Sequence, residues 1–323
     1  MKFDFSVIVL TYHPDREKLL ATLRSIIMQR NVRMEILVAD DGTPDFCESC
    51  IHSFMAEHSF ADYRVLAHEQ NQGTVKNLLD AVAHARGKYI KPISPGDYLY
   101  DADTLKEMYD FMTRNDAKAA FGDMVYYFCD GALRVTNRKT PGVDRIYLEG
   151  NRNYRHRQAI KNQMVYTDYI SGAAVAYENA GFRMSLEEIA GAVTYAEDTV
   201  MQLLAVKGER IYRIPRYVVW YEYGTGISTN AQLGFTGRVK KDFYQFYQML
   251  ADKYPGAPYI KRTLRLWRSD MEQKTRKYQI LRCLELDRHV FRFFRHGAMK
   301  KYVCSGYAED TFWNIVKNDP PTP

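Results

Sequence analysis

The sequence predicts an α/β fold in which a mostly parallel sheet carries helices on both faces. Short apolar runs such as FSVIVL at 5–10 alternate with longer segments whose apolar residues recur at helical spacing. Strand, helix and strand at these spacings are typical of βαβ units, whose strands pair in parallel. Polar residues follow the runs, and in parallel sheets ligands bind beyond the carboxyl ends of the strands. The pattern therefore predicts both the fold and the edge that carries the site.

The first third of the chain supplies four strands with helices between them. Residues 5–10 form the first strand, and the turn at His13-Pro14 leads into a helix with Leu19 and Leu23 on one face. We expect further strands at 35–39, 63–67 and 88–93, and helices at 45–58 and 74–85. The turn at Asp40-Asp41-Gly42 ends the second strand, and Gly87 ends the last of these helices.

The pattern is less regular after residue 119. Two strands joined by the Asp130-Gly131 turn are expected first, and the basic, Tyr- and Asn-rich stretch that follows is predicted to be a loop over the site. The ranges are strands at 119–128 and 132–137, the loop at 140–165, an acidic helix near 195–208 and a strand at 210–223. From about residue 240 the pattern turns helical and basic. We expect a catalytic domain at 1–238 and a basic helical region at 239–323.

Charge is distributed unevenly along the 323 residues. The net charge is +6, but residues 238–301 hold 17 Lys and Arg against 6 Asp and Glu, so the remainder is acidic. One predicted helix places apolar and basic residues on adjacent arcs: Ile280, Leu284, Phe291 and Phe294 beside Arg288, Arg292 and Arg295. Such a helix either packs its aromatic rings on the catalytic domain or docks on an anionic membrane surface. Nucleic acid is not an expected partner.

Composition excludes several classes of protein. There is no run of about 18 apolar residues, so no transmembrane helix is expected, and the first residues read as a strand rather than a secretion signal. Five cysteines fit a reducing compartment, so Cys47 and Cys50 are expected as reduced thiols in a helix. We expect a cytoplasmic protein, peripheral to the inner face of the membrane if the basic region docks there. Without GxGxxG or GxxxxGK[ST], a dinucleotide or P-loop site is not expected.

Four polar clusters follow the four strands of the first third. They are Thr11-Tyr12-His13, Asp40-Asp41, Asn71-Gln72-Gly73 and Ser94-Pro95-Gly96-Asp97. Because they end strands of one sheet, we expect them to converge on a single site. Asp40 and Asp41 have two interpretations. They are a turn and helix cap, or one carboxylate accepts a hydrogen bond from a nucleobase while the other holds the turn.

Four stretches resemble, in order and spacing, the motifs of the inverting family-2 glycosyltransferases with the GT-A fold. They are FSVIVLTYH, EILVADDGT, NQGTVKNLLDAVAHARGKYIKPISPGDYL and AEDTVMQL, within residues 3–230. The resemblance implies a GT-A type, Rossmann-like, mostly parallel sheet flanked by helices, with a helical C-terminal extension. It also implies transfer from a nucleotide-sugar donor, with uridine favoured, to a saccharide or lipid-linked saccharide acceptor in surface glycan biosynthesis.

The resemblance assigns residues to the donor. These are Leu10, Thr11, Tyr12, Asp40, Asp41, Lys76, Asn77, Ser94 and Gly96. Tyr12 and Asp41 match positions that hold the nucleobase, and Lys76 stands where the family usually has arginine. A lysine carries the charge without the bidentate fork of arginine, so its contact would be looser. The alternative is that Lys76 is a solvated helix lysine.

The metal-binding loop of the family, here called the metal loop, has fewer acidic residues in this chain than is usual. Ser94-Pro95-Gly96-Asp97 stands where Asp-Ala-Asp-Asp is usual, which leaves Asp97 as the acid available to Mg²⁺ or Mn²⁺. Mg²⁺ takes few protein carboxylates and completes its shell with phosphate oxygens and water. One aspartate with a diphosphate can therefore hold the cation. We expect metal binding to be weak alone and strong with the nucleoside diphosphate.

Glu197-Asp198 matches the catalytic acid pair of the family, with Asp198 as the general base. Such a base typically contributes a rate factor of about 10²–10⁴. The alternative is that the pair complements a helix dipole. After the last strand, Tyr221-Glu222-Tyr223-Gly224 replaces the family's usual Tyr-Arg and histidine, so a third metal ligand from this segment is not implied. Gly224, Gly226 and Ser228 form either a lid or a plain turn.

Two rival functions follow from the same residues. The loss of acidic residues from the metal loop suggests a catalytically degenerate protein that binds a sugar nucleotide. A nucleotidyltransferase on a similar sheet would need a Gly-rich, basic loop directly after the first strand, which TYHPDREK lacks.

Overall fold

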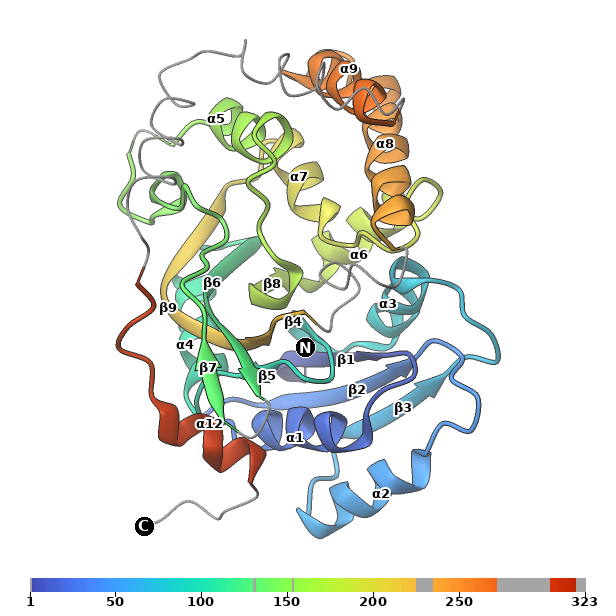
Figure 1. The fold of residues 1–323 in the computed structure, drawn as a ribbon, viewed down its shortest axis with the longest axis vertical. Helices are drawn as coiled ribbons and strands as arrows, with labels where there is room; N and C mark the ends of the chain where they lie inside the picture. Colours follow the sequence, from blue (N-terminus) through green and yellow to red (C-terminus); the bar gives the residue numbers. More distant parts are fainter. Residues whose placement is uncertain (1, 130–131, 153, 225–234, 272–302, 318–323) are drawn as a thin grey trace.

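The computed structural model describes residues 2–129, 132–152, 154–224, 235–271 and 303–317. In these residues the strands form one curled sheet of order β3-β2-β1-β4-β8-β6-β9-β5, with β7 paired to β6 (Figure 1). The strands are β1 (Phe3–Thr11), β2 (Met34–Asp40), β3 (Tyr63–Ala67), β4 (Gly87–Ile93), β5 (Tyr98–Leu99), β6 (Ala119–Cys129), β7 (Leu133–Val135), β8 (Val175–Glu178) and β9 (Ile211–Glu222). The predicted mixed α/β fold with a mostly parallel sheet is confirmed.

Helices cover both faces of the sheet. They are α1 (Arg16–Ile27), α2 (Glu48–Glu57), α3 (Thr74–His84), α4 (Thr104–Arg114), η1 (Arg145–Tyr147), α5 (His156–Ile160), η2 (Lys161–Val165), η3 (Gly172–Ala174), α6 (Asn179–Ile189), α7 (Thr199–Val206), α8 (Phe235–Lys253), α9 (Ile260–Met271) and α12 (Glu309–Val316). In β1, Val7 and Val9 face the core under α1, α2 and α4, while Ile8 faces the core under α3, α6 and α7. Burial on both faces explains why the strand sequence is continuously apolar.

The first four strands pair in parallel, as their sequences predict. β1 lies between β2 and β4, and β3 pairs with β2 on the outer side. The carboxyl ends of β1, β2 and β4 therefore open on the same side. Beyond β4 the sheet becomes mixed, because β8 runs antiparallel to β4 and to β6, while β9 runs parallel to β6. The expected antiparallel pairing of β6 and β7 is present, with Tyr127 opposite Val135, while the Asp130-Gly131 turn lies outside the described residues.

The stretch 140–165 was predicted to be a loop, and this is wrong. It contains η1, α5 and η2, and its apolar residues Ala159, Ile160 and Met164 are buried in the core beside α7. Their spacing is hidden in the sequence by the basic and amide residues between them. Burial of a few apolar side chains against a neighbouring helix overrides the polar composition of the stretch.

The C-terminal helices pack directly on the catalytic sheet and its helices. Phe246, Tyr247 and Leu250 of α8 are fully buried in the core that includes α7, and the Tyr247 hydroxyl donates to Gln202 Oε1 at 2.8 Å. α12 packs at the other end of the molecule, where Phe312 contacts Trp220 (Figure 1). The basic helix expected at 280–295 lies outside the described residues, and the division at residue 238 stays a prediction.

The cysteines differ from the sequence expectation. Cys47 and Cys50 form a disulfide at the start of α2, with their Cα atoms 5.4 Å apart, where two reduced thiols were expected. The spacing allows this because the start of a helix brings residues three apart onto one side. Cys304 is a free, buried cysteine. Within the described residues, no helix is long and apolar enough to cross a membrane.

Candidate active site

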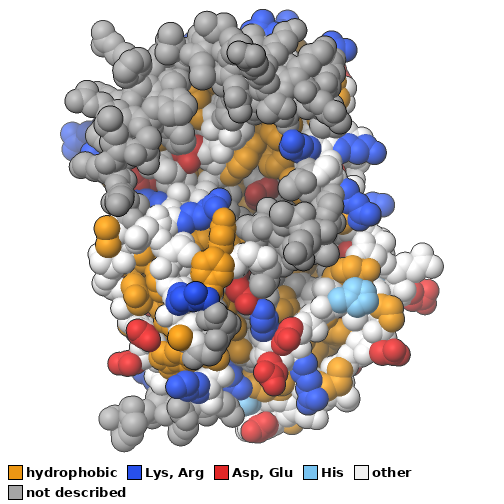
Figure 2. Space-filling view, viewed as in Figure 1, with side chains coloured by type: hydrophobic (Ala, Val, Ile, Leu, Met, Phe, Trp, Pro, Cys, Tyr) orange, Lys and Arg blue, Asp and Glu red, His pale blue; other side chains and the backbone are white. Residues whose placement is uncertain are grey.

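A cavity of about 680 Å³ opens at the carboxyl ends of the parallel strands. Its volume lies within the range of about 300–1,000 Å³ that is typical of ligand pockets. Its walls come from the loops after β1, β2 and β4, the segment before α7, the end of β9, and α8. Acidic and basic side chains lie close together on the lower half of the face shown in Figure 2, where α1 and these loops lie.

The cavity brings together most of the residues singled out in the sequence. Leu10, Thr11, Tyr12, Asn77, Ser94, Asp41, Asp97, Glu197 and Asp198 all line it. Three others do not belong to its lining. Asp40 is buried beside it, Lys76 is exposed on α3, and Gly96 lies in the metal loop with its backbone at φ +94°.

Asp40 and Asp41 each hold a piece of backbone in place. Asp40 accepts hydrogen bonds from the Thr43 N–H at 2.6 Å and the Thr11 hydroxyl at 2.8 Å, so it fixes the turn after β2. Asp41 accepts from the N–H groups of Gln72 and Gly73, at 2.7 and 2.9 Å, and so ties the loop before α3 to the strand end. Each carboxylate oxygen of Asp41 keeps a second lone pair for a ligand.

Asn77 carries an uncompensated polar atom at the cavity wall. Its amide nitrogen donates to the Ala39 carbonyl at 3.0 Å, and its side chain is almost fully buried. Its Oδ1 has no hydrogen-bond partner among the described residues. A buried oxygen without a donor costs about 1–3 kcal/mol, and this atom is enclosed, so Asn77 contributes to the cavity wall through its packing and its bond to Ala39.

The Asp97 carboxyl is buried at the end of the metal loop. Its Oδ1 accepts the Glu222 backbone N–H at 3.1 Å, which fastens the loop to the end of β9. Burial raises the pKa of Asp97 to about 7, against the lowering effects of this N–H group and of Lys91. The Glu222 charge raises the pKa of Asp97 further.

Lys91 lies under the same loop and is fully buried. Its ammonium donates to the carbonyls of Pro92 and Ala173, both at 2.7 Å. Burial lowers the pKa of Lys91 to about 7, while Asp97 raises it. This lysine anchors the loop to η3, and its charge and that of Asp97 stabilise each other.

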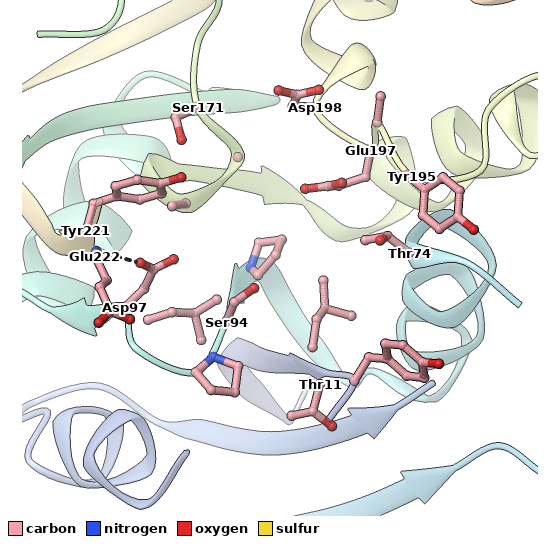
Figure 3. A pocket seen from close by; sticks show the side chains of 18 of the residues that line it. Thr11, Thr74, Ser94, Asp97, Ser171, Tyr195, Glu197, Asp198, Tyr221 and Glu222 are labelled. Atoms are coloured by element: carbon pink, nitrogen blue, oxygen red, sulfur yellow. Dashed lines mark hydrogen bonds between the residues drawn. The ribbon is translucent and has the colours of Figure 1, made fainter. Parts of the chain in front are cut away.

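Glu197 and Asp198 stand at the start of α7 and point into the cavity (Figure 3). Asp198 is the N-cap residue, yet its side chain makes no capping hydrogen bond to the described backbone. Helix capping therefore does not account for its position. Burial raises the pKa of both carboxyls, to about 6 for Asp198 and about 8 for Glu197, and the Asp198 charge adds to the rise at Glu197.

A carboxylate from α8 supports the segment before this pair. Asp242 Oδ2 accepts the backbone N–H groups of Thr194, Tyr195 and Ala196 at 3.1, 2.6 and 3.2 Å. These three bonds fix the chain directly before Glu197. Asp242 was not identified from the sequence, where it is one of two acids in a basic helix and lies 46–48 residues away from its partners.

Two cationic side chains of the cavity were also missed. Lys18 of α1 donates to both carboxylate oxygens of Glu222 at 2.6 and 2.8 Å. Arg138 donates to the Tyr223 hydroxyl at 2.7 Å and lies over the rings of Tyr223 and Tyr126. Lys18 and Glu222 are separated by 204 residues, so no local pattern could pair them. The expected lid at Gly226 and Ser228 lies outside the described residues.

Comparisons with known proteins agree with this geometry. The profile described as Glycosyl transferase family 2 matches residues 6–189. Among solved structures, S. aureus TarS 1-349 is similar with a TM-score of 0.55 and 19% identity, covering 84% of this chain and 73% of that one. The mannosyltransferase PcManGT from Pyrobaculum calidifontis, in complex with GDP-Man and Mn²⁺, is similar with a TM-score of 0.57 and 14% identity, covering 92% and 80%. At these identities the likeness concerns the fold.

TarS 1-349 in complex with UDP is similar with a TM-score of 0.53 and 18% identity, covering 91% of this chain and 78% of that one. Comparison with curated proteins gives no match. The family match spans more than half of the chain, from β1 to the end of α6. The chain belongs to glycosyl transferase family 2 and is a glycosyltransferase.

Proposed function

We propose that this enzyme transfers a sugar from a nucleotide-sugar donor to a hydroxyl of a saccharide or lipid-linked saccharide acceptor, with inversion at the anomeric carbon. One observation supports the proposal: buried carboxyls face one cavity from two different elements of the fold. Asp97 lies in the loop after β4, and Glu197 with Asp198 lies at the start of α7, across the cavity in Figure 3. The first position suits a diphosphate with its cation, and the second suits a base for the acceptor.

The nucleobase end of the donor is proposed to lie along β1 and α3. Tyr12, with 48% of its surface exposed, offers a ring for stacking. Asp41 has spare lone pairs, so it favours the N–H groups of a base, and Asn77 lines the same wall of the cavity. Uridine is favoured by the resemblance, while the similar structures hold UDP in one case and GDP-Man in another.

The charge of the cavity supports a divalent cation. Six carboxyl groups but two Lys or Arg side chains are among its lining residues. Burial raises the pKa of Asp97, Glu197 and Asp198, so additional negative charge is disfavoured there. A nucleoside diphosphate would therefore enter with a counter-ion.

Asp97 is the proposed protein ligand. The described residues hold no group of three or more His, Cys, Asp or Glu side chains that could bind a metal alone. Hard carboxylate oxygens fit Mg²⁺ or Mn²⁺, which take remaining ligands from phosphate and water. When bound, the cation would neutralise charge on the leaving diphosphate.

Asp198 is the proposed general base. It removes the proton from the acceptor hydroxyl as that oxygen bonds to the anomeric carbon and the bond from this carbon to the diphosphate oxygen breaks. Burial raises the pKa of both carboxyls, and the Asp198 charge raises the pKa of Glu197 further, so an ionised Asp198 favours a protonated Glu197. A neutral neighbour leaves the developing charge on the acceptor free of extra repulsion.

The proposals for the acceptor and for the location of the enzyme come from the basic C-terminal region. Its apolar and basic residues at 280–295 favour an anionic membrane surface and hence a lipid-linked acceptor in surface polysaccharide biosynthesis. Salt-sensitive binding of the protein to anionic liposomes would support this arrangement. Absence of binding at low salt would remove the membrane from the proposal.

The experiment that tests the function combines calorimetry and product analysis. UDP and GDP are titrated with and without Mn²⁺, and then nucleotide sugars carrying the base that binds are assayed for transfer and hydrolysis. We expect binding that strengthens with Mn²⁺ and transfer with inverted anomeric configuration. Tight donor binding without turnover on any acceptor would indicate the degenerate binding protein instead.

A further inference from the structure

The place of the missing carboxylate in the metal loop is occupied by another side chain. Gly96 stands where the family usually has an aspartate, and a Cβ built on Gly96 would lie 2.5 Å from Glu222 Oε2. The Glu222 carboxylate thus fills the space into which a side chain at position 96 would project. Glu222, at the end of β9, therefore places a carboxylate where this loop has none of its own.

Glu222 is held next to Asp97 by backbone geometry. Its own N–H donates to Asp97 Oδ1 at 3.1 Å, and both side chains line the cavity. Figure 3 shows the two residues together on one side of the cavity. Two carboxylates this close repel each other, so the arrangement favours a positive charge between or beside them.

Lys18 supplies a positive charge at this point. Its ammonium contacts both Glu222 oxygens, at 2.6 and 2.8 Å, and 36% of the Lys18 side chain is exposed, against 11% for Glu222. The ammonium is a compact point charge on a flexible stem, so it can leave without disturbing the backbone. The Lys18 ammonium therefore occupies the position at which the Glu222 carboxylate can bind a cation.

We propose that Glu222, together with Asp97, provides the protein carboxylates for the divalent cation, and that Lys18 competes with this cation for Glu222. The inference deepens the proposed function and rests on it. Mg²⁺ usually takes one or two protein carboxylates in sites completed by substrate phosphates. The acid that the loop after β4 lacks is thereby supplied by β9, 125 residues beyond Asp97.

The test measures Mn²⁺ affinity of the full chain by electron paramagnetic resonance of free Mn²⁺, in the presence of whichever of UDP or GDP binds. Glu222→Gln keeps the size of the side chain, and we expect it to weaken Mn²⁺ binding by about 10–100-fold. Lys18→Met removes the competitor, and we expect it to strengthen Mn²⁺ binding by about two- to fivefold. In the double variant the gain from Lys18→Met should vanish, because its competitor role requires Glu222.

Matched controls use ion pairs away from the cavity. Glu149→Gln breaks the exposed pair with Arg114, and Lys106→Met breaks the exposed pair with Asp110, so neither should change Mn²⁺ affinity. Thermal melts of each variant separate loss of a ligand from loss of the fold. Opposite signs for two isosteric changes in one ion pair cannot arise from general destabilisation.

Two results would overturn the inference. Unchanged Mn²⁺ affinity in Glu222→Gln would show that the cation is held without Glu222. Loss of nucleotide binding in Lys18→Met, with no Mn²⁺ dependence in the unmodified chain, would show that Lys18 itself serves as the cation. Either result leaves sugar transfer by the unmodified enzyme intact, whereas failure of the proposed function would appear as no transfer at all.

Discussion

The two sides of the cavity are built in different ways. On the wall proposed to bind the donor, here called the donor side, Asp40 and Asp41 have partners close in sequence or on a neighbouring element, as with Asp40 and Thr43. On the wall proposed to bind the acceptor, here called the acceptor side, the important contacts join distant segments, as with Asp242 and the chain at 194–196. The acceptor side therefore depends on how α8 docks, and on the donor side Asp97 depends in the same way on β9.

The sharpest test of the acceptor side is Asp198→Asn. The amide cannot accept the acceptor proton, so we expect kcat to fall by about 10²–10⁴ while donor binding is kept. Steady-state transfer and nucleotide calorimetry measure the two quantities. Glu187→Gln, in an exposed pair on α6, is the control and should match the unmodified enzyme. Intact transfer in Asp198→Asn would move the base elsewhere.

Asp242→Asn tests whether α8 positions that base. Its buried carboxylate accepts three backbone N–H groups, and hydrogen bonds to charged groups are worth about 1.5–3 kcal/mol each. We expect the free energy of unfolding to fall by about 2–3 kcal/mol. We also expect kcat to fall while the donor KM holds, since the donor side is untouched.

Asp252→Asn, at the exposed end of α8, is the control. Equal loss of kcat and donor affinity would argue for general damage rather than positioning.

The pH profile tests the acidity of the acceptor side. The ionised form of Asp198 is active, and its pKa is raised to about 6, so kcat/KM should rise with pH to a plateau above about 6. Below this value, each unit of pH should cost about tenfold. The groups facing Asp198 are Glu197 and the buried Tyr177, with Asp242 acting on Glu197. If the residual activity of Asp198→Asn shows the same fall of kcat/KM at low pH, the titrating group is a residue other than Asp198.

The smallest effect is expected at Lys76, on the donor side. Its side chain is exposed and lies outside the cavity lining, so Lys76→Met should change the donor KM by no more than about twofold. Asn77→Ala is the paired variant on the same helix and should raise the donor KM more, because Asn77 lines the cavity. A large effect at Lys76 would restore the role that the resemblance gives it.

The sequence by itself determined the parallel half of the fold and most of the donor side. Continuous apolar strands and helical spacing are local properties, and each predicted strand from 5–10 to 88–93 is present. Strand ends in a parallel sheet share one edge, so Thr11, Asp41 and Asp97 had to converge. The acid pair before α7 was singled out in the sequence through its resemblance to a family motif, and in the fold it lines the same cavity.

Only the tertiary structure decided the rest. The helices within 140–165, the Asp242 support and the Lys18–Glu222 pair all depend on which distant segments meet. The disulfide depends on the local path of the chain at the start of α2. Such contacts leave no periodic trace, since one side chain at one position is sufficient for each. The loop after β4 is the clearest case. In the sequence it lacks a carboxylate at Gly96, and in the fold Glu222 stands in that space because β9 ends beside it.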